Sequence, residues 1–256
     1  MVYGRAQVSG DAQINGKVEI YGKALVFGEA QIYNKAKIFD EAKISDNAKV
    51  YGDALVYGEA LIFDKAQVYD NVKIYGEAQI YHDAEVFDYA NVYGKSEIYG
   101  DAKVYNNAKV YDEAQISESA KIYDNAEVFG ETKVYGNAEV LNNSRVYDKA
   151  KIYGDAKIYD KVCVYGEAEI FDNAKIYDKA QIYDKAKIFE YAMVCDYAQV
   201  YDKAQVYECT KISDYAKVYD KAQVFGQAEI YGKAEVYDKA KVSGDTKVFG
   251  DTKIYY

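Results

Sequence analysis

The chain has 256 residues and a formal net charge of −10, with no Pro, no Trp, one His, 31 Tyr and 18 Gly. Half of the residues are hydrophobic, which excludes a disordered chain, and the acidic balance excludes nucleic acid as an expected partner, because phosphate binding needs a basic surface. No apolar run reaches the ~18 residues of a membrane helix, and no signal peptide opens the chain. We therefore expect no membrane partner, and the cytoplasm is the default location.

A six-residue repeat begins at Val2 and continues without insertion to Ile254. Val or Ile occupies every sixth position, 43 in all, and the position four residues later is Ala in 33 of 42 cases. The residue after each Val or Ile is aromatic in 35 of 43 cases, and the next is usually Gly, Asp or Asn. The unit is therefore Ala-x-Val-Tyr-Gly-x, where x is mostly polar or charged.

This period predicts β-structure, because six residues at ~3.6 per turn would scatter the Val and Ile positions around a helix. Within Ala-x-Val-Tyr, alternate residues share a face, so Ala and Val point inward while x and Tyr point outward. Gly, Asp and Asn tolerate left-handed backbone angles and should form the corner. We expect four-residue strands, two-residue corners and an all-β solenoid.

The aromatic positions indicate how many units make one coil. Sorted by 18 residues, two of the three columns are interrupted, the first by Ser9, Ser45, Ser117 and Ser243 and the second by Asn15, Leu141, Cys195 and Ser213. The third column is aromatic at all 15 positions: Tyr3, Tyr21, Phe39, Tyr57, Tyr75, Tyr93, Tyr111, Phe129, Tyr147, Tyr165, Tyr183, Tyr201, Tyr219, Tyr237 and Tyr255. This column predicts three units per coil, hence a single triangular β-helix over residues 1–256, with about 14 coils of 18 residues and no loops or evident caps.

An aliphatic residue followed four places on by a small one, repeated by six, resembles the hexapeptide-repeat family of left-handed parallel β-helices. The resemblance covers the whole chain and implies left-handed coiling. The chain departs from that family in carrying Tyr or Phe after the aliphatic residue. It is most similar to uncharacterised Tyr-rich bacterial proteins with Val-Tyr-Gly-Asn-Ala-type tandem repeats.

The best-known members of that family are acyltransferases with a catalytic His and an extended loop that helps to bind the acyl donor. The single His of this chain, His82, is followed by Asp83 and occupies a corner position that elsewhere holds Gly or Asp. No loop interrupts the repeat to bind a substrate. We therefore expect no catalytic residue and no enzyme activity, with a degenerate acyltransferase as a remote alternative.

Two residue classes suggest metal or redox chemistry. Cys163, Cys195 and Cys209 do not recur by 18, so they predict neither a zinc site nor a disulfide, and we expect surface variants without a special role.

Carboxylates do recur by 18 residues. The carboxylates of such a column repel one another or attract a cation such as calcium. In the column that runs from Asp184 to Asp238 a Lys follows each Asp, which favours a solvated Asp/Lys lattice over a cation site. We expect no cofactor and no bound metal. The columns comprise Asp160, Asp178, Asp196 and Asp214, and Asp184, Asp202, Asp220 and Asp238.

The outward aromatic columns exceed what a solenoid needs, because Lys or Glu at those positions would give solubility. Stacked rings could hold the coils in register, form a protein interface, or offer a platform for sugar rings. We expect a non-enzymatic structural or self-associating rod in which the 15-residue column is the interface. The expected partner is a second copy, lateral or end to end, and the alternative is a glycan-binding module that uses stacked Tyr faces.

Overall fold

The computed structural model describes all 256 residues, and its regular elements are 42 two-residue β-strands joined by four-residue turns. Strand βn covers residues 6n + 1 and 6n + 2, from β1 (Gln7–Val8) to β42 (Lys253–Ile254). The structure contains no helix long and apolar enough to cross a membrane. The predicted all-β class is confirmed.

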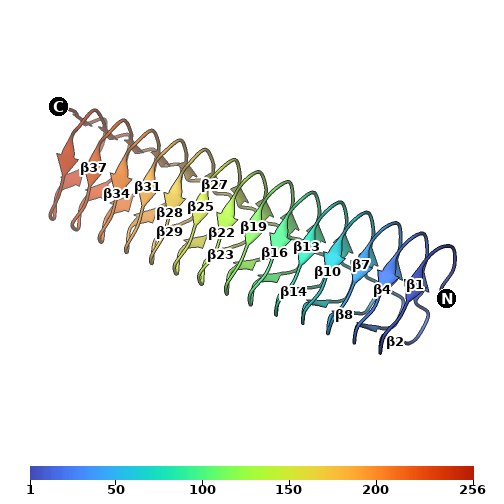
Figure 1. The fold of residues 1–256 in the computed structure, drawn as a ribbon. Coiled ribbons are helices and arrows are strands. Elements are labelled where there is room, and N and C mark those ends of the chain that lie inside the picture. Colours follow the sequence, from blue (N-terminus) through green and yellow to red (C-terminus); the bar gives the residue numbers. More distant parts are fainter. The chain divides into compact units, whose positions relative to one another are not determined.

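The structure divides into two compact units, Met1–Gly130 with β1 to β21 and Glu131–Tyr256 with β22 to β42. Within each unit every third strand pairs in parallel, so that three sheets form, and residue i lies opposite residue i + 18, as Lys187 does opposite Gln205 (Figure 1). One coil is therefore 18 residues, and the chain makes about 14 coils. This confirms the predicted three-sheet solenoid.

The core of each unit contains the Val, Ile and Ala positions of the repeat. Ile176, Ala180 and Ile182, for example, are fully buried. Where Ser or Thr replaces Ala, its hydroxyl donates to the carbonyl three residues earlier, as Thr210 does to Tyr207 at 2.7 Å. This local bond lets a polar side chain occupy the interior without an unsatisfied donor.

The strands are shorter than the predicted four residues, yet the hydrogen bonds between coils continue around each corner. Gln199, Tyr201 and Lys203 each donate a backbone N–H to the next coil, over 2.9, 3.1 and 2.7 Å. Only Gln199 lies in a strand, because the following residues already bend into the turn. Inter-coil bonding at every second residue therefore fixes the position of each corner as firmly as that of each strand.

The corner position, which is two residues after each Val or Ile, has a positive φ throughout. All 18 glycines lie there, with φ from 65° to 92°, together with 24 other residues with φ from 56° to 66°. Their backbone angles confirm the predicted corner. Asp is the commonest of the 24, and it has a second function.

Several of the corner Asp residues accept a backbone hydrogen bond from the next coil. Asp214 Oδ2 accepts the N–H of Gly232 at 2.9 Å, and Asp148 Oδ2 accepts that of Gly166 at 3.1 Å. The N–H of a corner residue donates to no backbone carbonyl, whereas the N–H groups of the residues on either side of it donate to the next coil. The carboxylate thus supplies the acceptor that the backbone lacks.

Candidate functional site

The 15-residue aromatic column forms an uninterrupted stack in each unit, which we call ladder A. It runs from Tyr3 to Phe129 in the first unit and from Tyr147 to Tyr255 in the second. Successive ring centroids lie 4.7–5.2 Å apart, and the ring planes differ by at most 6° except at the last pair, Tyr237 and Tyr255, where they differ by 22°. The predicted column is therefore a continuous stack within each unit.

The rings of ladder A cover one another's faces. Parallel rings this close must overlap, since coplanar rings at that separation would collide. The inner rings are accordingly half-buried, while Tyr3 and Tyr255 at the ends are 48% and 60% exposed. Ladder A lies outside the core, as predicted, but it presents ring edges and few open ring faces.

The phenol groups lie back over the outer sheet faces. Tyr219 donates its hydroxyl hydrogen to Glu235 Oε2 at 3.2 Å, and Tyr69 donates to Glu85 Oε2 at 3.4 Å. Burial, followed by the neighbouring phenols, raises the pKa of Tyr183 and of Tyr201 to about 12. The rings of the ladders thus belong to the packed surface of each sheet.

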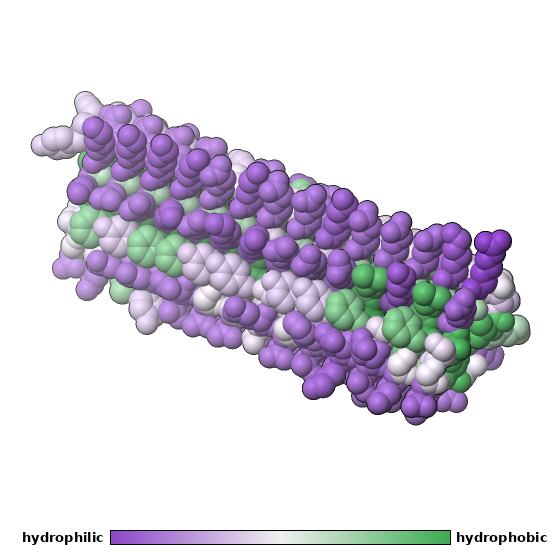
Figure 2. Space-filling model, in the orientation of Figure 1, coloured by the Kyte–Doolittle hydropathy of each residue, from purple (hydrophilic) through white to green (hydrophobic).

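The other two aromatic columns form shorter stacks. Ladder B follows the strands of the sheet that begins with β1, and ladder C follows those of the sheet that begins with β2 (Gln13–Ile14). Figure 2 looks onto the first of these sheets and shows a band of green and pale side chains between hydrophilic rows. Ladder B comprises Phe27, Phe63, Tyr81, Tyr99, Tyr135, Tyr153, Phe171, Phe189, Tyr207 and Phe225, and ladder C comprises Tyr33, Tyr51, Tyr69, Phe87, Tyr105, Tyr123, Tyr159, Tyr177, Tyr231 and Phe249.

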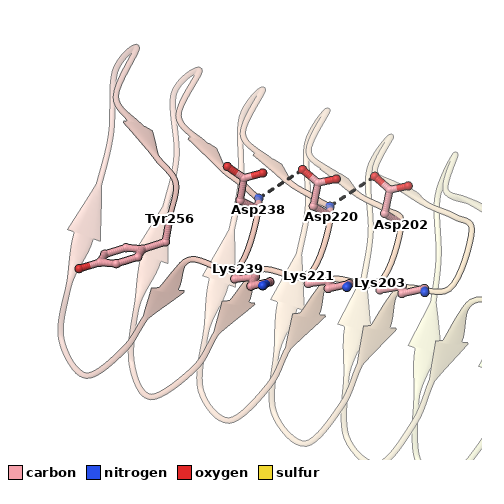
Figure 3. A pocket seen from close by; sticks show the side chains of 7 residues that line it. All are labelled: Asp202, Lys203, Asp220, Lys221, Asp238, Lys239 and Tyr256. Carbon is pink, nitrogen blue, oxygen red and sulfur yellow. Dashed lines mark hydrogen bonds between the residues drawn. The ribbon is translucent and has the colours of Figure 1, made fainter.

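A groove of about 360 Å³ runs along the corner beside ladder A in the second unit (Figure 3). The Asp row, on one side, consists of Asp202, Asp220 and Asp238, and the Lys row, on the other, consists of Lys203, Lys221 and Lys239. Tyr256 lies at the end of the groove.

Two members of the Asp row accept backbone hydrogen bonds, and none forms an ion pair with the Lys row. Asp202 and Asp220 each accept the N–H of the next corner residue, over 3.3 and 3.2 Å. No carboxylate lies within ion-pair distance of any Lys of the Lys row, whereas Lys185, one coil earlier, pairs with Glu167 at 3.1 Å. The Lys row therefore carries three exposed ammonium groups without a partner.

Charge is distributed unequally over the repeat. The corner position holds 20 carboxylates and no Lys or Arg, whereas the first position of the strands holds 18 Lys or Arg and 8 Glu. Ion pairs along the strands, such as Lys187 with Glu169 at 2.8 Å, use only some of these cations. The corners are thus acidic and the outer sheet faces are basic.

His82 occupies a corner with φ 57°, as expected from its place in the repeat. The carboxylate nearest its ring belongs to Asp64 of the preceding coil, with Nε2 3.8 Å from Oδ2, and the ring contacts Tyr81 edge-on. Asp83, which follows His82 in the sequence, instead has its carboxylate 4.0 Å from the ammonium group of Lys65. The separation of 18 residues between His82 and Asp64 was the signal that could have identified this neighbour.

All three cysteines are free thiols, and one expectation about them is wrong. Cys195 is buried, with 2% of its surface exposed, because it takes an aromatic position of ladder C that neighbouring coils cover. Burial raises the pKa of its thiol to about 11, and the thiol donates to Asp196 Oδ2 at 3.3 Å. No group of three or more His, Cys, Asp or Glu side chains in the structure could hold a metal ion.

Comparisons with known proteins add no family. No family model matches the chain, and no curated protein matches it. The function is therefore argued from the geometry.

Proposed function

We propose that the chain is a non-enzymatic structural protein that associates laterally with copies of itself through ladder A. The observation that carries this proposal is the continuity of ladder A beside two interrupted ladders. Stacking within one chain would tolerate gaps, as ladder C does. A column without gaps in either unit is better explained by a partner that contacts its whole length.

The surroundings of ladder A have the composition of an interface. Tyr201, Tyr219 and Tyr237 are each followed by an Asp and then by an unpaired Lys, so a half-buried aromatic strip borders directly on charged rows. Protein interfaces combine an aromatic centre, rich in Tyr, with a polar rim. The ring edges offer apolar area with little loss of side-chain freedom on binding, since the stack already orders them.

The proposal includes membership of the hexapeptide-repeat family and left-handed coiling. Three six-residue units per coil and corners with positive φ support it. The non-enzymatic role draws on the regularity of the chain, in which every connection is a four-residue turn and none extends to form a substrate pocket. A degenerate acyltransferase, the remote alternative, would have to use the exposed corner residue His82.

Glycan binding is a second candidate at a different place. A sugar ring stacks on an open aromatic face, and the inner rings of ladder A offer none. Tyr197 and Tyr215, however, lie outside the ladders, are 45% and 57% exposed, and stack at 5.0 Å. Lys179 Nζ lies over the Tyr197 ring, 4.6 Å from its centroid, so Tyr215 is the ring on which a sugar would stack. Tyr197 borders a groove of about 300 Å³ that also contains Asn143 and Asp178, side chains able to bind hydroxyl groups.

Sedimentation velocity tests whether ladder A is the interface for self-association. The triple variant Tyr183→Lys/Tyr201→Lys/Tyr219→Lys places three charges in ladder A, and we expect it to sediment as a monomer with an unchanged β-type circular dichroism spectrum. Tyr51→Lys/Tyr69→Lys/Tyr105→Lys, a matched change in ladder C, should associate like the unaltered protein. The proposal fails if the unaltered protein is a monomer or if both variants associate equally.

A further inference from the structure

The second unit carries two charged rows that recur at the same interval and have opposite sign. The first is the Lys row, which follows ladder A by two residues, across the groove from the Asp row, and has no carboxylate partner within ion-pair distance. The second, which we call the acid row, consists of Asp172, Glu190 and Glu208 and follows directly after Phe171, Phe189 and Tyr207 of ladder B. Each row therefore borders an aromatic stack of the same unit.

The acid row is free to meet a cation. Asp172 and Glu208 are exposed and Glu190 is half-buried, and none of the three forms an ion pair. The residues after them at the same corner are Asn173, Tyr191 and Cys209, so no Lys or Arg in that corner neutralises the row. Three carboxylates at one-coil spacing repel one another until cations approach.

The two rows match in spacing because one backbone sets both. Each coil contributes one Lys to the Lys row and one carboxylate to the acid row. The aromatic stacks beside them repeat at 4.9–5.0 Å next to the Lys row and at 4.9 Å next to the acid row. Two copies of the chain therefore bring every member of one row opposite a member of the other without deforming either.

We propose that the Lys row and ladder A of one copy dock on the acid row and ladder B of a second copy. This inference rests on the proposed self-association and names the partner surface. Aromatic edges form the centre of the contact, and ion pairs between the rows fix its register. Because the two surfaces differ, the contact is heterologous, and repeated contacts build a ring or an open lateral array and not a closed dimer.

The Asp row keeps its negative charge, because a hydrogen bond from a backbone N–H does not neutralise a carboxylate. Figure 3 shows the Asp row and the Lys row on opposite sides of the groove, and no Asp of the first lies within ion-pair distance of a Lys of the second. The approaching acid row therefore meets ammonium groups along the Lys side. Such exposed pairs weaken as salt rises, because the Debye length falls from about 10 Å at 0.1 M to about 3 Å at 1 M.

Charge reversal tests the pairing of the rows. We expect Lys203→Glu/Lys221→Glu and, separately, Glu190→Lys/Glu208→Lys to weaken self-association at least about tenfold, since each places like charges opposite each other. An equimolar mixture of the two variants should associate again, because the Glu row of one meets the Lys row of the other. Sedimentation velocity at low and high salt measures all three samples, and circular dichroism verifies that each variant is folded.

The outcomes separate this inference from the proposed function. If the mixture fails to associate, the row pairing is wrong. The row pairing is also wrong if each of the two charge-reversed variants associates as strongly as the unaltered protein. In both cases ladder A can still be the interface. A monomeric unaltered protein overturns the proposed function itself. Self-association that survives Lys203→Glu/Lys221→Glu, together with lost binding of polyglutamate, would also overturn the pairing and identify an acidic polymer as the occupant of the Lys row.

Discussion

At the scale of the residue, the acidity of the chain originates in the needs of its corners. A corner residue must adopt a positive φ, and a corner N–H needs an acceptor that the backbone does not supply. Asp meets both needs, as Asp214 does for Gly232. The net charge of −10 follows from a corner position with 20 carboxylates, which outweighs the basic strand position. The charge is thus a consequence of turn chemistry.

A substitution at Gly52 tests how closely the corners of successive coils approach each other. Its φ is 78°, and a Cβ built on it would lie 2.5 Å from the backbone nitrogen of Asp70 in the next coil. We expect Gly52→Ala to cost about 1–3 kcal/mol in free energy of unfolding through this overlap, in addition to the about 1–2 kcal/mol of a left-handed Ala. Urea denaturation followed by circular dichroism measures the change.

Gly250→Ala is the matched control, since Gly250 has φ 66° and a Cβ there would have no atom within 4 Å. It should show the left-handed cost alone. Equal destabilisation by the two substitutions would mean that the coils separate freely at Gly52, and the close contact would then have no energetic weight.

Sequence reasoning identified the corner but not the role of its Asp. The composition of the position predicted left-handed geometry, because Gly, Asp and Asn share that tolerance. The hydrogen bond from Gly232 to Asp214 depends on how the carboxylate is oriented toward a residue 18 positions away. Only the stacked coils determine that orientation, so turn preferences could not reveal it.

At the scale of the strand, alternation separates buried from exposed side chains within two residues. In β29 (Lys175–Ile176), Ile176 is fully buried whereas Lys175 is exposed. A carboxylate at position 176 would lie in an apolar interior without a partner. We expect Ile176→Asp to abolish cooperative unfolding of the second unit, and limited proteolysis should cut near that residue.

Lys175→Glu is the control in the same strand. Lys175 forms no ion pair, and its neighbour Lys157 already pairs with Glu139 at 3.2 Å, so an added carboxylate should change the free energy of unfolding by no more than about 0.5 kcal/mol. Wild-type denaturation midpoints for both variants would show that the inward face of β29 is wrongly assigned.

The period of the sequence was sufficient to predict which strand face is inside, but not how the outer face is arranged. Alternation alone places Tyr outside the core. That the rings lie half-buried over the sheet, with Tyr219 bonded to Glu235, depends on side-chain angles and on the neighbouring coil. Coverage by the neighbouring coils also explains why Ser45, at an aromatic position of ladder B, is only 8% exposed, although an isolated strand would expose it.

At the scale of the whole molecule, the repeated tyrosines make the folded state less stable at alkaline pH. Burial is the main cause that raises the pKa of Tyr165, Tyr183 and Tyr201 to about 12, with neighbouring phenols second. The unfolded chain ionises its phenols near pH 10, so between pH 10 and 12 it has lost protons that the folded chain retains. Stability is therefore full below pH 10 and falls as the pH rises toward 12.

Replacement of those tyrosines by Phe should move the loss of stability to a higher pH. Tyr165→Phe/Tyr183→Phe/Tyr201→Phe keeps the stack, since Phe39 and Phe129 occupy the same column in the first unit. It also removes three groups that ionise on unfolding, so we expect the triple variant to unfold at a higher pH than the unaltered protein, with equal urea midpoints near pH 7. Circular dichroism and phenolate absorbance, recorded together from pH 8 to 13, measure both transitions. An unchanged alkaline midpoint would mean that lysine deprotonation, which breaks pairs such as Lys247 with Glu229, drives the unfolding and that ladder A contributes nothing to it.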